Sequence, residues 1–370
     1  MRGKKIVFGL IAVIISLSLL EIGVRYLVSK TNYPDFEVFL SMELNQTRYT
    51  AEPFLNYVNN SKFINEYGIR EFNSLGLKYP SEISVEKPAG VYRILCLGGS
   101  TTYGLTEDPA NSFPARLEES LNQQISTLNL NCNKIECLNA GLSGATSAEI
   151  LTHYLFKLNR LQPDLLVIHT GLNDAIMYLP LCNSQYQPDY HNRKRLFPEI
   201  PPLNPLLHFL VKSRTIGVIV YLLKYRDYAE VTLEKNPFFE FDNKNEWLPY
   251  GNDSMYSVRY NAFYNNIKSL LTIASSNNQK TLLVTEVTDE AEFLATDQLP
   301  DTVKNVLQEG FGRNKKFLQK LAIELNTPIC ELNNNDFPPE FFSDFMHVKE
   351  VGELKKARLI EKSLIEIWKN

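Results

Sequence analysis

The chain has 370 residues, a net charge of −4, 44% hydrophobic residues and 22% charged residues. These values are typical of globular proteins and exclude wholesale disorder. A mildly acidic chain also lacks the basic footprint of nucleic-acid binding, so we expect no nucleic-acid partner.

The first 30 residues carry a targeting signal. Basic residues precede an apolar run over residues 6–28, which is 23 residues long and therefore long enough to cross a bilayer of about 30 Å at about 1.5 Å per residue. Glu21 and Arg25 are four positions apart and are expected to pair near the far interface. A cleaved signal peptide is the alternative, but no A-x-A cleavage pattern follows the run. We expect residues 1–30 to be an uncleaved, single-pass membrane anchor with a cytoplasmic amino terminus and the rest extracytoplasmic.

Residues 31–88 are polar, aromatic and irregular, and we expect a juxtamembrane stalk that packs onto a main domain over residues 89–370. That domain begins with strand and helix patterns in alternation. We expect strands at 91–97, 135–139, 164–169, 280–287 and 328–332. Helices are expected at 112–125, 147–161 (capped by Ser147), 258–275, 303–325 (with a break near Gly310 and Gly312) and 349–368.

An insertion over residues 176–257 interrupts the alternation. It contains an apolar helical run at 206–225 whose charged residues argue against a second bilayer span. We interpret it as a cap beside the active-site edge, and leave open whether it touches the membrane surface. The alternating pattern as a whole predicts an α/β protein with a five-stranded parallel sheet covered on both faces. Sites in such sheets lie beyond the carboxyl ends of the strands.

The cysteines give no metal or redox motif. No CxxC pair is present, which argues against a zinc ribbon or a thioredoxin-like site. Cys96 and Cys330 lie in apolar runs and are expected in the core. Cys132 and Cys137 flank a short loop, and the sequence leaves open whether they form a disulfide.

The first chemical motif, Gly98-Gly99-Ser100-Thr101-Thr102-Tyr103-Gly104, directly follows the first strand of the main domain. Its glycines permit a tight turn that presents Ser100 at the strand end. A phosphate-binding loop is excluded because no Gly-Lys-Ser/Thr follows. The G-x-S-x-G elbow of α/β-hydrolases does not match either, because Thr102 occupies the second glycine position.

Two further motifs follow the second and third strands. The stretch 139–147 is rich in small residues, including Gly144, so that a backbone N–H can approach a ligand, although an ordinary βα turn has the same composition. Gly171-Leu172-Asn173-Asp174 places an amide donor after the third strand. Such a donor suits an oxyanion, and an Asx turn is the structural alternative. Asp174 is expected to cap a helix or to support the site.

The fourth motif, Ser343-Asp344-Phe345-Met346-His347, follows the fifth strand. A catalytic imidazole requires a carboxylate on its far nitrogen, and a spacing of three allows Asp344 to reach His347. His169 is the alternative base because it also lies near a strand end, whereas His153 is expected to be structural. His191 and His208 fall in the insertion.

Together the four motifs resemble the SGNH/GDSL hydrolase family over about residues 90–370, excluding the insertion. The resemblance implies a flavodoxin-like α/β/α sandwich and a mechanism without metal or cofactor. It implies a catalytic triad formed by Ser100, Asp344 and His347. It also implies an oxyanion hole formed by Ser100, Gly144 and Asn173. One departure is that the family's usual Gly-Asp-Ser is Gly98-Gly99-Ser100 here.

The expected function is a serine esterase that hydrolyses carboxylic esters, with acetyl esters of cell-envelope carbohydrate as the expected substrates. Its activity should fall as the pH drops through about 6–7, because a protonated imidazole cannot act as a base. Three alternatives remain open from the sequence. They are an O-acyltransferase acting on a surface polysaccharide, a thioesterase or lipase, and a catalytically inactive binding protein.

Overall fold

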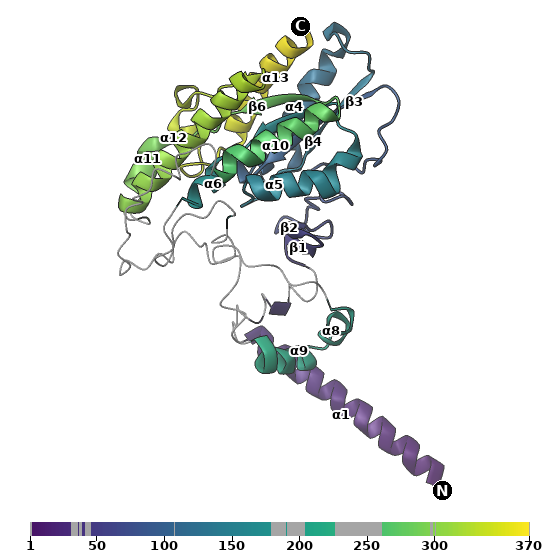
Figure 1. Ribbon diagram of the computed structural model, residues 1–370. Coiled ribbons are helices and arrows are strands. Elements are labelled where there is room, and N and C mark those ends of the chain that lie inside the picture. The colour runs from purple at the N-terminus through teal and green to yellow at the C-terminus, as the bar shows by residue number, and fades with distance from the viewer. Residues whose placement is uncertain are drawn as a thin grey trace.

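A five-stranded parallel sheet forms the centre of the α/β domain (Figure 1). In the computed structural model, residues 2–30, 36, 39–40, 46–106, 108–178, 190, 204–225, 261–296, 299 and 301–369 are described. The strands are β3 (Val91–Gly98), β4 (Lys134–Asn139), β5 (Leu165–His169), β6 (Lys280–Val284) and β7 (Ile329–Cys330), and their spatial order is β4-β3-β5-β6-β7. Numbered along the sheet-forming part of the chain this is 2-1-3-4-5, the flavodoxin-like order. The expected fold is therefore confirmed, although β6 and β7 are shorter than the sequence patterns indicated.

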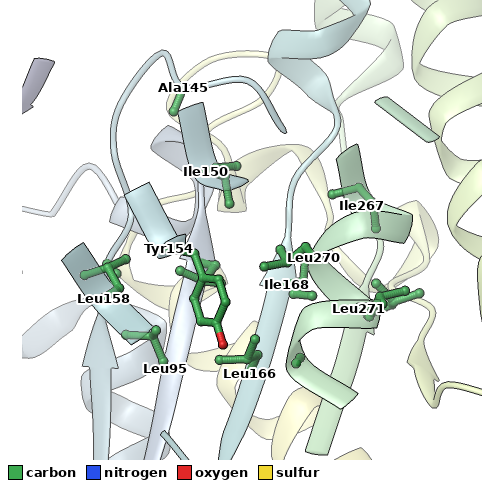
Figure 2. Close-up of a cluster of buried hydrophobic side chains, with 14 of the residues drawn as sticks. Leu95, Ala145, Ile150, Tyr154, Leu158, Leu166, Ile168, Ile267, Leu270 and Leu271 are labelled. Atoms are coloured by element: carbon green, nitrogen blue, oxygen red, sulfur yellow. The ribbon is translucent and has the colours of Figure 1, made fainter. Parts of the chain in front are cut away.

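Helices cover both faces of this sheet. Helices α4 (Phe113–Gln123) and α13 (Glu350–Lys369) pack on one face. The other face is covered by α5 (Ser147–His153), α10 (Ala262–Ser276) and α12 (Asp301–Glu324). Along β3, successive side chains from Ile94 to Leu97 point to opposite cores, which explains why this part of the strand is apolar. Figure 2 shows one core, where Tyr154 and Ile150 meet Leu166 and Ile168 of β5 and Leu270 of α10.

Two helix expectations were wrong in detail. Thr146, not Ser147, is the N-cap of α5, and the backbone N–H of Thr146 donates to Glu149 in a capping box (2.8 Å). After His153 the helix continues as a π turn (Tyr154–Leu158) and a 3₁₀ turn (Asn159–Leu161). Helix α12 is continuous through Gly310, where a Cβ atom would lie only 2.8 Å from the side chain of Ala175. The glycine therefore serves close packing against α6 (Leu172–Ile176) rather than a helix break.

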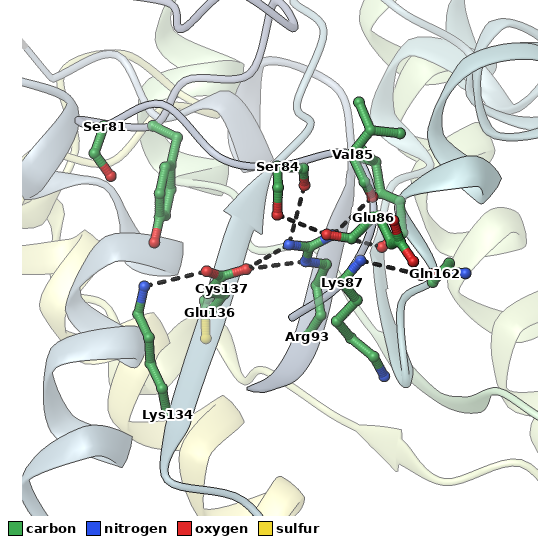
Figure 3. Close-up of polar contacts among 12 residues, drawn as sticks. Ser81, Ser84, Val85, Glu86, Lys87, Arg93, Lys134, Glu136, Cys137 and Gln162 are labelled. Atoms are coloured by element: carbon green, nitrogen blue, oxygen red, sulfur yellow. Dashed lines mark hydrogen bonds and ion pairs between the residues drawn. The ribbon is translucent and has the colours of Figure 1, made fainter. Parts of the chain in front are cut away.

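A buried ion pair joins β3 to β4 and to the segment before the sheet (Figure 3). The Arg93 side chain is fully buried, and its Nη2 lies 2.8 Å from Glu136 Oε2. Its other donors reach the carbonyls of Leu161 (2.7 Å), Val85 (3.3 Å) and Ser84 (3.3 Å). Because every contact pairs a buried donor with an acceptor, the buried charge is compensated.

Residues 46–88 pack against the sandwich. They begin with an antiparallel hairpin of β1 (Tyr49–Glu52) and β2 (Leu55–Asn59). Tyr57, Leu77 and Tyr79 from this segment are buried in the same core as α5 and α10. The Tyr57 hydroxyl donates to the carbonyl of Ser143 (2.7 Å), so the hairpin also supports the loop after β4.

The amino-terminal helix α1 (Arg2–Lys30) is long and apolar enough to cross a membrane. Its part Lys4–Lys30 has 27 residues and a mean hydropathy of 2.5, and its apolar window is not buried against the rest of the chain. Glu21 and Arg25 pair as expected, with 2.9 Å between Oε1 and Nε.

The segment 204–225 is not one continuous helix. It forms α8 (Pro205–Leu210) and α9 (Arg214–Val220), followed by a π turn (Tyr221–Tyr225). Asn204 and Ser213 cap the two helices. Helix α9 contacts the carboxyl-terminal part of α1, beside which it lies in Figure 1. The rest of the expected insertion, with Cys182 and His191, lies outside the described residues apart from 176–178 and Tyr190.

The remaining short elements are α3 (Ser100–Tyr103), α11 (Glu290–Ala295) and 3₁₀ turns at Pro109–Asn111, Ile125–Thr127, Asn334–Asp336 and Pro339–Phe341. Cys96, Cys137 and Cys330 are buried, and Cys132 and Cys137 are both free thiols.

Candidate active site

Ser100 lies at the carboxyl end of the central part of the sheet, directly after β3. It is the first residue of the one-turn helix α3 and is only 7% exposed. Gly98 is required there, because a Cβ atom would approach the carbonyl of His169 and the Thr102 hydroxyl to 2.0 Å. The turn is closed by the N–H of Tyr103, which donates to the Gly99 carbonyl (2.9 Å). A glycine pair thus lets β3 pass tightly into a turn that presents the Ser100 hydroxyl.

The loop after β7 places His347 and Asp344 against this hydroxyl. His347 Nε2 lies 2.8 Å from Ser100 Oγ, and His347 Nδ1 lies 2.7 Å from Asp344 Oδ2. Asp344 Oδ1 accepts the backbone N–H groups of Met346 and His347, both at 2.9 Å. These bonds hold the carboxylate at the start of the turn, so that a spacing of three residues brings it to the imidazole.

The ionisation of Asp344 favours this arrangement. Burial alone would raise the pKa of Asp344, but hydrogen bonding and charge interaction with His347, together with the two backbone N–H groups, lower it below its ordinary value. The carboxylate is therefore held in its ionised form, in which it can orient the ring and stabilise an imidazolium.

The loops after β4 and β5 flank Ser100, because β4 and β5 are the two neighbours of β3. Gly144 has a φ of 77°, in the left-handed region that favours glycine. The Asn173 amide donates one proton to the Ala145 carbonyl (2.9 Å), which fixes the amide between the two loops. Asn173 Nδ2 also lies 2.7 Å from the position that a Cβ atom on Gly99 would occupy. The amide thus adjoins the residue before Ser100 and has a second N–H to offer.

Asp174 is a supporting residue, as its position suggested. Its buried carboxylate accepts the Ser147 N–H (3.0 Å) and the Ser147 hydroxyl (2.5 Å) at the start of α5, and the Tyr190 hydroxyl (2.6 Å). Burial raises the pKa of Asp174 to about 6, although these hydrogen bonds act in the opposite direction. Asp174 therefore joins the loop that carries Asn173 to the helix that follows the Gly144 loop.

His169, the alternative base, is held away from Ser100 by other partners. Its ring is fully buried, with Nε2 2.9 Å from Glu286 Oε2 and Nδ1 3.2 Å from Thr102 Oγ1. Glu286 also accepts the hydroxyl of Thr101, the residue after Ser100 (2.9 Å). Burial would raise the pKa of Glu286, but charge interaction with His169, hydrogen bonds from His169 and Thr101, and the nearby Lys356 lower it.

This buried network was missed by the sequence patterns. Lys356 from α13 donates to the Thr101 carbonyl (2.7 Å) and pairs with Glu353 (2.6 Å). Glu286, two residues beyond β6, stands in an otherwise apolar stretch, and this was the available signal. His153 is buried in α5, and burial lowers its pKa to about 4, which agrees with a structural role.

The Asp344–His347 side of the site reaches solvent. The side chains of Asp344 and His347 are 44% and 15% exposed, respectively. Within the described ranges, no group of three or more His, Cys, Asp or Glu side chains is placed to hold a metal ion. The chemistry available from these residues is nucleophilic attack by a hydroxyl with an imidazole as base.

Comparison with known proteins identifies the class. Residues 96–227 match the model of the GDSL-like lipase/acylhydrolase family. This part of the chain therefore carries a GDSL-like lipase/acylhydrolase domain, which supports an ester-hydrolysing activity. The chain matches no curated protein sequence.

Solved structures of this type resemble the chain at low identity. A lipase/acylhydrolase from Enterococcus faecalis is 15% identical and has a TM-score of 0.42, with 74% of this chain and 96% of that chain covered. The acetyl xylan esterase AlAXEase is 13% identical with a TM-score of 0.42, covering 74% and 99%. An acetylxylan esterase from Geobacillus stearothermophilus, in a catalytic-mutant form, is 13% identical with a TM-score of 0.40, covering 74% and 94%.

Proposed function

We propose that the protein is a serine esterase with Ser100 as nucleophile, His347 as general base and Asp344 as the carboxylate that orients the base. The observation that carries the proposal is the unbroken series of contacts from Ser100 Oγ to His347 Nε2 (2.8 Å) and from His347 Nδ1 to Asp344 Oδ2 (2.7 Å). Heavy-atom distances of about 2.6–3.2 Å are those at which a base removes a proton from a nucleophile.

The reaction would proceed in two halves. In the first, Ser100 Oγ attacks the ester carbonyl carbon while His347 takes the hydroxyl proton. The imidazolium then gives that proton to the alcohol oxygen, the C–O bond breaks, and an acyl-serine remains. In the second, His347 removes a proton from water, the resulting hydroxide equivalent attacks the acyl group, and the proton returns to Ser100 as the carboxylic acid leaves.

Both tetrahedral intermediates carry a negative oxygen that needs hydrogen-bond donors. We propose that the donors are the backbone N–H groups of Ser100 and Gly144 and the side-chain amide of Asn173. The amide is neutral and is already fixed by its bond to Ala145, so it stabilises the oxyanion without reorganising.

For the substrate we propose acetyl esters of cell-envelope carbohydrate. The Asp344 side chain is 44% exposed, so one end of the proposed triad faces solvent, which suits an ester on a bulky, hydrated alcohol. Helix α1 would anchor the enzyme in the membrane, and the basic residues at its start favour a cytoplasmic amino terminus and an extracytoplasmic site.

The experiment compares ester hydrolysis by the full chain in detergent with that of Ser100→Ala. Substrates are acetyl, butyryl and longer p-nitrophenyl esters and acetylated xylo-oligosaccharides. We expect acetyl esters to react fastest and Ser100→Ala to lose on the order of 10⁴-fold or more in kcat. Ser276→Ala, at the end of α10, is the matched control and should retain wild-type rates. Wild-type rates in Ser100→Ala would refute the nucleophile, and acetyl transfer to added oligosaccharide in place of acetate release would identify an acyltransferase.

A further inference from the structure

Two charged residues of α1, Glu21 and Arg25, bind the helical segment 204–225, which is remote in the sequence. Glu21 Oε1 accepts the N–H of Arg214 (2.7 Å), and Oε2 accepts the Ser213 hydroxyl (2.7 Å) and the N–H of Thr215 (3.0 Å). Arg25 donates to the Lys212 carbonyl (2.9 Å) and to Glu21 (2.9 Å). Glu21 thus satisfies the free N–H groups at the start of α9, while Arg25 satisfies a carbonyl in the turn before it.

Apolar packing fixes the same contact. Phe36, Phe39, Leu40 and Val211 are buried together, with Val28 of α1 and residues of α8, α9 and the π turn around them. The rings of Phe36 and Phe39 lie 5.5 Å and 5.6 Å from that of Tyr221. The polar and apolar contacts agree, so α9 is docked on the carboxyl-terminal part of α1, and α8 packs into the same apolar cluster through Leu207.

The outer surface of the docked segment is apolar to a degree unusual for a water-facing surface. Large side chains on α8, α9 and the π turn are more than half exposed: Leu206 (66%), Phe209 (67%), Ile219 (51%), Leu222 (61%) and Leu223 (79%). Single exposed apolar residues are common in soluble proteins, but several on adjoining short helices indicate an interaction surface.

The position along α1 indicates what covers this surface. A hydrocarbon core of about 30 Å takes up about 20 helical residues. If it begins at Ile6, where the apolar run starts, it ends near Arg25. The contacts of Glu21 and Arg25 with residues 212–215 therefore lie at the far boundary of the hydrocarbon. Lys212 and Lys224 belong to the same segment, and long basic side chains reach from this depth to the lipid headgroups.

We propose that α8, α9 and the π turn lie in the far interface of the bilayer that α1 spans, with Leu206, Phe209, Leu222 and Leu223 among the upper acyl chains. The partner is the phospholipid itself. This proposal rests on the membrane anchoring included in the proposed function. The protein would then have a second attachment to the membrane beside α1. This attachment would fix the depth of α1 in the bilayer and its rotation about its own axis.

The test uses tryptophan quenching by brominated phosphatidylcholine in vesicles that contain the full chain. Leu223→Trp reports on the proposed interfacial segment, Ile14→Trp on the middle of α1, and Ile323→Trp, at an 84% exposed position of α12, on water. Signals from the native Trp247 and Trp368 are subtracted with the wild-type chain. We expect Leu223→Trp to be quenched at least twofold, more by lipid brominated at carbons 6 and 7 than at carbons 11 and 12. Ile14→Trp should show the reverse depth order, and Ile323→Trp should not be quenched.

Two results would overturn the proposal and are distinguishable. Quenching of Ile14→Trp without quenching of Leu223→Trp would leave the membrane anchor intact and reject the interfacial position of the segment. The same result is expected if a second copy of the chain covers the apolar surface. Absence of quenching at Ile14→Trp would reject the anchor and with it the segment's place in the bilayer. Neither result would affect the assignment of the triad, which ester hydrolysis tests separately.

Discussion

The amide of Asn173 occupies the space next to Gly99 that a side chain would need. A Cβ atom at position 99 would lie 2.7 Å from Asn173 Nδ2 and 3.4 Å from the Ala145 carbonyl. Gly99 stands where related enzymes commonly have aspartate, so the missing side chain is matched by the close approach of the amide. If Asn173 is an oxyanion donor, residue 99 controls its position.

Gly99→Asp should therefore lower kcat although it brings the motif closer to the family's usual sequence. The added side chain must displace the Asn173 amide, and loss of one oxyanion donor costs on the order of 10²–10³ in kcat. Steady-state kinetics with p-nitrophenyl acetate measure the effect. Gly312→Ala is the control, because a Cβ atom there meets nothing within 4 Å. A Gly99→Asp enzyme as active as the wild type would show that the amide is not used in this position.

Asp344→Asn should reduce kcat on the order of 10³–10⁴-fold with little change in KM. The asparagine retains an acceptor for the N–H groups of Met346 and His347, but an amide facing Nδ1 favours the tautomer with a proton on Nε2. That tautomer cannot accept the Ser100 proton. Asp336→Asn, at a position with 48% side-chain exposure, should leave both constants unchanged. A large rise in KM with kcat retained would indicate a binding role for Asp344 instead.

The pH dependence of the wild-type enzyme should show a single titrating group on the acid side. Because the pKa of Asp344 is lowered, its carboxylate stays ionised at weakly acidic pH and adds no second step to the profile. We expect log(kcat/KM) to fall with a slope of one as the pH decreases, measured with acetyl esters at constant ionic strength. A slope of two would mean that another group must also be deprotonated.

Asp174→Asn should change how stability depends on pH. The folded-state pKa of Asp174 is raised from 3.8 to about 6, so the folded state binds this proton more tightly than the unfolded state. The contribution of this bound proton to the free energy of unfolding is fully present below about pH 4. It is lost as the pH rises through about 6. The loss corresponds to roughly 3 kcal/mol at about 1.36 kcal/mol per pKa unit.

The measurement is urea unfolding of both chains in detergent from pH 4 to pH 7. Relative to Asp174→Asn, the wild type should lose stability across this range, because the variant has no carboxylate to ionise. Parallel curves would contradict the raised pKa. Asp336→Asn serves again as an exposed control.

Glu286→Gln should destabilise the fold although glutamine has nearly the same size as glutamate. The substitution removes the charge that faces His169 (2.9 Å) and weakens the bond from Thr101 (2.9 Å). Glu286 is only 11% exposed, and leaving buried polar partners unpaired costs about 1–3 kcal/mol. Urea unfolding measures the loss, with the exposed Glu340→Gln as control. Equal stabilities of the two variants would show that the network contributes little.

Local sequence patterns predicted the sheet, the covering helices and the four loops, because each depends on residues near one another in the chain. Ser100, Gly144, Asn173 and His347 each follow a strand, and parallel strands end at one edge. The patterns failed where a residue's role is set by a distant partner. Gly310 was interpreted as a helix break because its neighbours Ala175 and Tyr178, in α6 and in the turn after it, are remote in the sequence. Glu286 was passed over for the same reason.

The membrane-proximal part shows the same limit. Glu21 and Arg25 were correctly expected to pair, since they are one helical turn apart. Their bonds to residues 212–215 could not be inferred, because nothing near 212 in the sequence indicates a partner in α1. The sequence therefore suggested a cap beside the site, whereas the structure places this segment against α1.

The central claim is that Ser100 is activated by His347, and active-site labelling tests it most directly. The full chain is treated with a fluorophosphonate, and the modified peptide is identified by mass spectrometry in the wild type, Ser100→Ala and His347→Gln. We predict a single phosphonylated serine at position 100 in the wild type, none in Ser100→Ala, and labelling slowed at least a hundredfold in His347→Gln. Labelling of a different serine, or an unchanged rate in His347→Gln, would contradict the account.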